Sequence, residues 1–162
     1  RVEELGIRLA HHFERNAFQN MQLHPKDTGG TFFEIDCQTN GMEHDGPWTP
    51  AGPDWKPAQR LDVVSAIAAA EIQSPRHNEL ARRWGEIAEI DVQTGDDGWP
   101  FLQLENAVAR FVEPTDGRPE GLGGLDLRVV DRDHVLRTAA ERGCPVDGDT
   151  VLVCGTRFRL VD

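Results

Sequence analysis

The chain has no tyrosine, only two methionines and three cysteines among its 162 residues. Cys37, Cys144 and Cys154 are an odd number without metal-type pairing, so reduced thiols in a cytoplasmic protein are the simpler interpretation; a Cys144–Cys154 bridge would need adjoining strands. No apolar run approaches the roughly 18 residues of a membrane span, and no secretory signal is visible. The sequence also lacks a glycine-rich phosphate loop, a nucleophile elbow and a Cys-x-x-Cys pair. The common signatures of nucleotide binding, acyl transfer and dithiol chemistry are therefore missing.

Basic residues are scarce relative to acidic ones. The chain has 17 Lys and Arg against 28 Asp and Glu, a net charge of −11. This balance argues against a nucleic-acid backbone or an anionic membrane surface as partner, because both repel a negatively charged protein. It leaves room for a local basic pocket and for a small-molecule substrate. The length and the 38% hydrophobic content suit a globular protein of one domain or two small ones.

The stretch 23–36 predicts a strand, a tight turn and a second strand. Two glycines in the turn allow positive φ, and the β-prone run Thr-Phe-Phe-Glu-Ile follows. Since alternate side chains of a strand share a face, Phe32, Glu34 and Asp36 point one way and Phe33 and Ile35 the other. A charge at mid-strand is costly when it is buried without a partner. Either this face is wet, or Glu34 meets a cation.

The segment His-Pro-Lys-Asp-x-Gly-Gly at 24–30, followed by a strand that carries a Glu, resembles the last hairpin of a vicinal-oxygen-chelate domain. That superfamily includes glyoxalase I, methylmalonyl-CoA epimerase, extradiol dioxygenases and bleomycin-resistance proteins, and the similarity is greatest to the glyoxalase and epimerase branch. The resemblance implies an α+β fold of βαβββ units, whose mixed sheets curl into a cup with helices outside.

The resemblance also implies a metal-dependent enzyme. The Glu of this last strand is a metal ligand in those families, and the role maps onto Glu34. The ion would be divalent, Zn, Fe, Mn, Co or Mg, and would stabilise an enolate of a small oxygenated substrate during isomerisation, epimerisation or lyase chemistry. The other ligands of the family lie on opening strands, which we expect before Arg1 or in a partner chain. The alternative is a metal-free binding or sequestering protein of the bleomycin-resistance type.

The histidines and Lys26 offer weaker candidates. His24 and Lys26 flank the turn and are candidate substrate contacts; alternatively, His24 only orients the turn and Lys26 is a surface charge. His11 and His12 alternate faces, so at most one points inward, and a strand-end pair without a ligand role is the simpler interpretation. Three further histidines are predicted to lie on the surface: His44, His77 and His134.

The chain order predicts three regions. Residues 1–37, with strands at 7–13, 18–24 and 31–36, are expected to be the C-terminal part of a first glyoxalase-like domain. Residues 38–60 are a connector rich in Pro, Gly and Trp, without regular elements. Residues 61–162 are expected to be a second glyoxalase-like domain, because strand–helix–strands recurs at 63–112 and 125–161. An incomplete first domain would expose a sheet edge, so we expect a homodimer or further N-terminal residues.

Local signals place the elements of the second domain. A strand at 63–73 is followed by an amphipathic helix with Ser74 as N-cap, Pro75 at its first position and Trp84 on its apolar side. Hairpins are expected at 101–112 and 150–161, and a strand at 125–130. Asp131 caps a second helix that ends at Gly143.

This second domain lacks the ligands of the family. The internal repeat aligns Arg159 with Glu34, and a guanidinium cannot ligate a cation. Arg159 is expected to be a surface or ion-paired residue; the alternative is an anion-binding residue inside the cup. Of the tryptophans, which could line a binding cup, Trp84 is predicted to lie in the core, and Trp48 and Trp55 to anchor the connector.

Overall fold

The computed structural model describes residues 1–41, 43 and 45–162. These residues form two compact units, which we call unit 1 (Arg1–Gln59) and unit 2 (Arg60–Asp162). Each is described by itself below. No helix in the described part of the chain is both long and apolar enough to cross a membrane.

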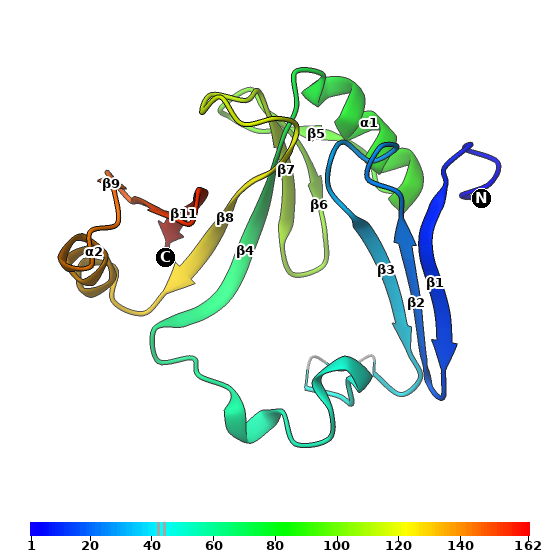
Figure 1. The fold of residues 1–162 in the computed structure, drawn as a ribbon, viewed down its shortest axis with the longest axis horizontal. Helices are drawn as coiled ribbons and strands as arrows, with labels where there is room; N and C mark the ends of the chain where they lie inside the picture. Colours follow the sequence, from blue (N-terminus) through cyan, green and yellow to red (C-terminus); the bar gives the residue numbers. More distant parts are fainter. Residues whose placement is uncertain (42, 44) are drawn as a thin grey trace. The chain divides into compact units, whose positions relative to one another are not determined.

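Unit 1 is a three-stranded antiparallel sheet in the order β1-β2-β3, and Figure 1 shows its strands side by side in blue. The bounds are β1 (Leu9–Arg15), β2 (Phe18–Leu23) and β3 (Phe33–Gln38). The first strand was predicted to end at Phe13 but continues to Arg15, because Asn16 at φ 54° makes a two-residue turn into β2. Phe18 and Leu23 on β2 are the most buried apolar side chains of the sheet.

The connector packs within unit 1. It contains two single-turn 3₁₀ helices, η1 (Thr49–Ala51) and η2 (Lys56–Ala58), so the prediction that it has no regular elements is wrong for these turns. A proline near the start of each turn supplies the required φ without losing a hydrogen bond. Trp48 meets the Phe18 ring edge-on at 5.1 Å between centroids, and Gln38 Oε1 accepts hydrogen bonds from Thr49.

Unit 2 is an eight-stranded mixed sheet in the order β5-β6-β7-β4-β8-β11-β10-β9. The first half comprises β4 (Val64–Gln73), α1 (His77–Ala88), β5 (Gln93–Thr94), β6 (Pro100–Gln103) and β7 (Val108–Val112). The second comprises β8 (Gly121–Val129), α2 (Arg132–Glu141), β9 (Val146–Asp147), β10 (Thr150–Val153) and β11 (Thr156–Val161). In each half the first strand pairs in parallel with the last, and the halves join through antiparallel β4 and β8. The predicted α+β fold of βαβββ units is confirmed; its curling into a cup stays a prediction.

The helix α1 packs against β6 and β7 (Figure 1). Its buried face is Leu80, Ala81, Trp84, Gly85 and Ile87, and Trp84 meets Phe111 edge-on at 5.4 Å. The predicted Ser74 cap is wrong, since Arg76 occupies the N-cap position. Ser74 still belongs to the sheet, because its N–H donates to Val112 O at 2.8 Å, while its hydroxyl accepts from Arg76 N at 3.0 Å.

The helix α2 matches its predicted ends. The Asp131 carboxylate accepts a hydrogen bond from His134 N at 2.9 Å, and Gly143 adopts φ 74° just past the last turn. Ala139 on this helix packs with Val151 and Leu160 of the sheet. The strand β8 begins four residues before the predicted Leu125, because Gly121 and Leu122 pair with the end of β4.

Candidate functional site

One face of the unit 1 sheet carries Glu34 among several polar side chains, and the rings of Phe13 and Phe18 lie on the same face. The strand pairing places Gln22 opposite Glu34, and Asn20 opposite Asp36. Because cross-strand partners share a face, these four side chains lie together; we call them the polar face. The predicted sharing of one face by Glu34 and Asp36 is therefore confirmed. His11 lies opposite Gln22 on β1, and His12 lies on the other face.

Two amides hold the two carboxylates of the polar face. Gln22 Nε2 donates to Glu34 Oε2 at 2.5 Å, and Asn20 Nδ2 donates to Asp36 Oδ1 at 2.7 Å. Asn20 is only 3% exposed, yet its Oδ1 has no hydrogen-bond partner within the described chain. A buried carbonyl oxygen without a hydrogen-bond donor costs free energy. This oxygen is therefore suited to bind a cation or another group that accepts a lone pair.

One carboxylate of the polar face, Asp36, has a shifted pKa. The pKa of Asp36 is raised, first by burial and then by the charge and a side-chain hydrogen bond of Glu34, against a lowering contribution from Asn20. No cation of the described chain is paired with either carboxylate. A bound cation would offset the repulsion, since an opposite charge favours the ionised form.

The donors of the polar face suit a hard ion. Glu34, Asp36 and Asn20 Oδ1 supply three oxygens, and Mg²⁺ commonly binds one or two carboxylates and retains several waters. They do not form a nitrogen-rich zinc site, because His11 lies two strands from Glu34, roughly 10 Å away. Among the described residues, no three His, Cys, Asp or Glu side chains come together as a metal centre.

His24 and Lys26 lie in the turn that follows β2. His24 Nδ1 accepts a hydrogen bond from Lys26 N at 3.2 Å, and the Lys26 side chain is exposed. The turn is fixed by a residue that sequence reasoning missed, Asp27. Its carboxylate accepts from Arg8 Nε at 2.9 Å and Nη2 at 2.7 Å, and the hydrogen bonds from Arg8 hold the pKa of Asp27 far below its usual range. The substrate roles of His24 and Lys26 stay predictions.

The surface predictions for the remaining three histidines differ in their outcome. His134 is exposed, as predicted. The surface prediction for His77 is wrong, because its ring packs edge-on against Trp99 at 5.1 Å and its Nδ1 is buried. The prediction for His44 falls outside the described residues.

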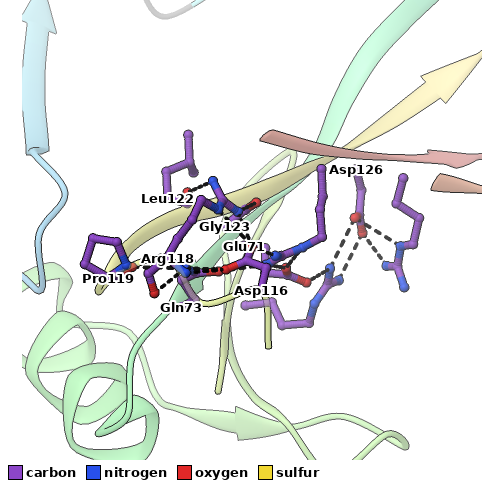
Figure 2. A network of polar contacts seen from close by, with 11 residues as sticks. Glu71, Gln73, Asp116, Arg118, Pro119, Leu122, Gly123 and Asp126 are labelled. Atoms are coloured by element: carbon purple, nitrogen blue, oxygen red, sulfur yellow. Dashed lines mark hydrogen bonds and ion pairs between the residues drawn. The ribbon is translucent and has the colours of Figure 1, made fainter. Parts of the chain in front are cut away.

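A network of arginines and carboxylates occupies the centre of the unit 2 sheet (Figure 2). Arg110 on β7 bridges two acids from neighbouring strands: it donates to Glu71 on β4 at 2.9 Å and to both oxygens of Asp126 on β8 at 3.0 and 3.2 Å. Arg159 on β11 also pairs with Asp126, with Nε 3.0 Å from Oδ1. We use the name arginine network for these residues together with four more: Gln73, Asp116, Arg118 and Arg157.

A second part of the arginine network reaches the loop before β8. Arg157 on β11 donates to Glu71 at 2.7 Å and to Gln73 at 3.0 Å, and it pairs with Asp116. Arg118 pairs with the same Asp116 at 2.6 Å. The labelled residues in Figure 2 show this continuity from Asp126 through Glu71 to Asp116.

The arginine network is a fully charged structure. Burial raises the pKa of Glu71 and of Asp126, but the hydrogen bonds and charges of the arginines outweigh burial, and both pKa values are lowered. Burial lowers the pKa of Arg110, yet its two carboxylate partners raise it well above the usual range. All these groups therefore remain ionised at neutral pH.

Glycine on β8 makes room for the arginine network. A Cβ at Gly123 would lie 2.5 Å from Arg157 Nη2 and 3.0 Å from Gln73 Oε1. A side chain at this position would displace the ends of Arg157 and Gln73, so its absence lets the Arg157 guanidinium cross β8 to reach Glu71. The interpretation of Arg159 as an ion-paired residue is confirmed, and unit 2 offers no free carboxylate at that place.

Hollows of different sizes also lie in unit 2. A cavity of about 170 Å³ borders the arginine network and is lined by Trp99, Thr150 and Arg159, among others. A second hollow of about 390 Å³ shares Trp99 and Arg110 with it. A third, largely apolar groove of about 560 Å³ lies between α2 and the sheet.

Several solved structures are similar to this chain at low sequence identity. A hypothetical protein from Staphylococcus aureus is 11% identical with a TM-score of 0.59, and the match covers 99% of this chain and 58% of that one. A putative dioxygenase from Bacillus subtilis is 16% identical with a TM-score of 0.49, over 96% of this chain and 56% of that chain. Methylmalonyl-CoA epimerase from Mycobacterium tuberculosis is 15% identical with a TM-score of 0.47, over 64% of this chain and 91% of that chain.

No protein-family model and no curated protein matches the sequence. The chain spans little more than half the length of the Staphylococcus aureus and Bacillus subtilis proteins. The likeness to the Staphylococcus aureus protein, with a TM-score of 0.59 over 99% of this chain, shows a shared fold alone.

Proposed function

We propose that this protein is a metal-dependent enzyme of the glyoxalase-like type, an isomerase, epimerase or lyase that acts on a small oxygenated substrate at the polar face of unit 1. The single observation that supports it best is the buried, unpartnered Oδ1 of Asn20 beside two mutually repelling carboxylates. Without a cation, this arrangement lowers the stability of the fold. It suits a cation that prefers oxygen ligands.

Each residue of the polar face has a role in this proposal. Glu34 and Asp36 hold a divalent ion together with Asn20 Oδ1, and the donors favour Mg²⁺ or Mn²⁺ within the set of candidate metals. Gln22 orients the Glu34 carboxylate through its 2.5 Å hydrogen bond. When bound, such an ion supplies Lewis-acid polarisation of substrate oxygens.

Substrate contacts and assembly complete the proposal. His24 and Lys26, at the end of β2, are proposed to meet a carboxylate or phosphate of the substrate. Further ligands are proposed to come from a second copy of the chain or from neighbouring chain segments, and a homodimer is the expected assembly. The assignment of residues 1–37 to one glyoxalase-like domain and of 61–162 to another is part of the same proposal.

The test is a Mn²⁺ titration of the purified protein, followed by electron paramagnetic resonance. One ion per chain is expected, with affinity weakened at least about tenfold by Glu34→Gln and by Asp36→Asn, since each removes a charged ligand. Glu14→Gln is the matched control, because Glu14 is exposed on the opposite face of the same sheet. Stoichiometric metal retained in the Glu34 variant would refute the ligand assignment.

Activity is tested separately by proton NMR in D₂O. Metal-loaded protein is expected to catalyse exchange of the proton next to a carbonyl in a panel of 2-oxo acids and thioesters, and the Asp36→Asn protein is not. Metal binding without any proton exchange would support the metal site but contradict the proposed isomerase and epimerase activity.

A metal-free binding protein is the second candidate, and one observation favours it. The apolar groove beneath α2 measures about 560 Å³, within the range of about 300–1,000 Å³ that is usual for small-molecule sites. Leu127, Val151 and Phe158 are among its lining residues, and His134, Thr138 and Arg142 are among its polar ones.

This candidate predicts ligands that raise the melting temperature equally with and without EDTA. Thr138→Trp places bulk in the groove and should abolish that shift, whereas Ala140→Trp, on the exposed side of the same helix, should leave it unchanged. A shift that depends on metal would exclude this candidate.

A further inference from the structure

Seven charged side chains of the arginine network alternate in sign along one continuous series of ion pairs (Figure 2). In order they are Arg159, Asp126, Arg110, Glu71, Arg157, Asp116 and Arg118. Four guanidinium groups therefore meet three carboxylates, so the series has one positive charge in excess and ends in an arginine on both sides. This local excess of positive charge contrasts with the net charge of −11 of the whole chain.

The two ends of this series differ. At one end, Arg118 also donates to the backbone oxygens of Leu122 at 3.4 Å and Gly123 at 2.7 Å. At the other end, the Arg159 guanidinium contacts only Asp126 among the described residues, through Nε and Nη2. A guanidinium has five N–H donors, so three of those on Arg159 remain available. The Arg159 side chain is 47% exposed, and this end is therefore open.

The open end faces a hollow with an apolar extension. Arg159 lines the cavity of about 170 Å³ together with Thr150, which is paired with it across β10 and β11, and with Trp99. The adjoining hollow of about 390 Å³ shares Trp99 and adds Phe101 and Val108. A charged donor group thus stands beside aromatic and aliphatic walls, the combination that orients a small organic acid.

We propose that the Arg159 end of the network binds the carboxylate of a small monocarboxylic acid, whose apolar or aromatic body lies against Trp99 and Phe101. The carboxylate supplies the fourth anion that the alternating series lacks, and Thr150 offers its hydroxyl as a further donor. The proposal is independent of the metal and goes beyond the proposed enzyme.

Size and charge restrict the ligand. Water takes a share of about 30 Å³ in the liquid, so the cavity of about 170 Å³ holds roughly six water volumes, enough for a carboxylate and a few carbons. Asp97 lines both hollows, and its negative charge disfavours a second negative charge on the ligand. A monocarboxylate is therefore preferred over a dicarboxylate or inorganic phosphate.

The test uses benzoate as probe, with benzamide as its neutral analogue of the same shape. Isothermal titration at fixed ionic strength should show benzoate binding and no measurable binding of benzamide, succinate or inorganic phosphate at the same concentrations. Arg159→Gln should weaken benzoate about tenfold to hundredfold, because a charge-assisted hydrogen bond is lost. Arg137→Gln, the same change at an exposed position of α2, should have no effect. EDTA and Glu34→Gln should also leave benzoate binding unchanged, which separates this site from the metal site.

Two further variants keep the test decisive if Arg159→Gln fails to fold, as judged by circular dichroism. Arg159→Lys retains the charge without the guanidinium fork, and Trp99→Leu removes the aromatic wall; both should weaken benzoate several-fold. Equal binding of benzoate and benzamide, absence of benzoate binding, or full affinity in folded Arg159 variants would overturn the proposal.

Discussion

The polar face of unit 1 and the arginine network of unit 2 treat carboxylates in opposite ways. On the polar face, Glu34 and Asp36 meet two neutral amides and each other, and the pKa of Asp36 rises. In the network, Glu71 and Asp126 each meet two arginines, and their pKa values fall. Glu34 and Arg159 occupy aligned positions on the last strand of their hairpins, yet they differ in charge.

The aligned strand position therefore serves a different purpose in each unit. A carboxylate without a countercharge is destabilising until something binds, which is typical of functional sites. A carboxylate held by two guanidiniums has its compensation built in and stabilises the fold once formed. Three substitutions and a change of pH test this contrast.

Arg110→Leu should cause the largest loss of stability, because it leaves both Glu71 and Asp126 buried with one partner fewer. Breaking a buried pair from one side costs about 3–5 kcal/mol in the free energy of unfolding. Urea unfolding of unit 2, followed by NMR of the Trp84 indole, measures it. Arg137→Leu is the exposed control and should change the value by less than about 0.5 kcal/mol. A loss below about 1 kcal/mol for Arg110→Leu would contradict the view that the network stabilises unit 2.

Acid should destabilise unit 2. The pKa values of Glu71, Asp116 and Asp126 are lower in the folded protein than in the unfolded chain, so the unfolded chain takes up protons first as the pH falls. Their contribution is present above about pH 4.5 and is lost progressively below it. Amide exchange between pH 6 and 2.5 should show loss of protection in β4 and β8. Constant protection of these strands would show that the arginines contribute little.

Gly123→Ala tests the room that the arginine network needs. The new methyl group would press on Arg157 Nη2 and Gln73, so we expect a loss of about 1–3 kcal/mol, the usual cost of overpacking. A double-mutant cycle with Arg157→Ala measures the coupling, and most of the cost should disappear in that background. Equal costs in both backgrounds would place the strain elsewhere.

Asp36→Asn should give the smallest effect and the opposite sign. The pKa of Asp36 is raised in the folded protein, so its ionised form at neutral pH costs stability, and this cost appears as the pH rises through that pKa. A neutral amide removes the repulsion from Glu34, and we expect a gain of less than about 1 kcal/mol for unit 1 without metal. Thermal unfolding at pH 7.5 with EDTA measures it; destabilisation would mean that Asp36 is already compensated.

Local sequence rules predicted most elements correctly because their causes are local. Asp131 and Gly143 bound α2 through a cap and a positive φ, and strand parity put Glu34 and Asp36 on one face. Ser74 failed as a cap because a tertiary contact, its N–H to Val112 O, draws it into the sheet. Tertiary hydrogen bonding thus overrode a local preference.

The arginine network was harder to foresee, because its members come from strands far apart in the sequence. One signal was available: Arg157 and Arg159 alternate within a strand, Arg110 is the one charged residue among the apolar residues 108–112, and Asp126 lies between two leucines. A buried charge requires a partner, so these residues had to find one another, but only the sheet order brings β7, β4, β8 and β11 together. The unpartnered Asn20 oxygen gave no sequence signal at all.

The seam between β4 and β8 divides unit 2 into two halves, each continuous in sequence, and only the loop 113–120 links them covalently. Cleavage in that loop would leave two peptides, each with a complete βαβββ half. Backbone hydrogen bonds of the seam and the Arg110–Asp126 and Glu71–Arg157 pairs cross it. Separately expressed halves should therefore recombine into one sheet, with an affinity that decreases as salt screens those pairs.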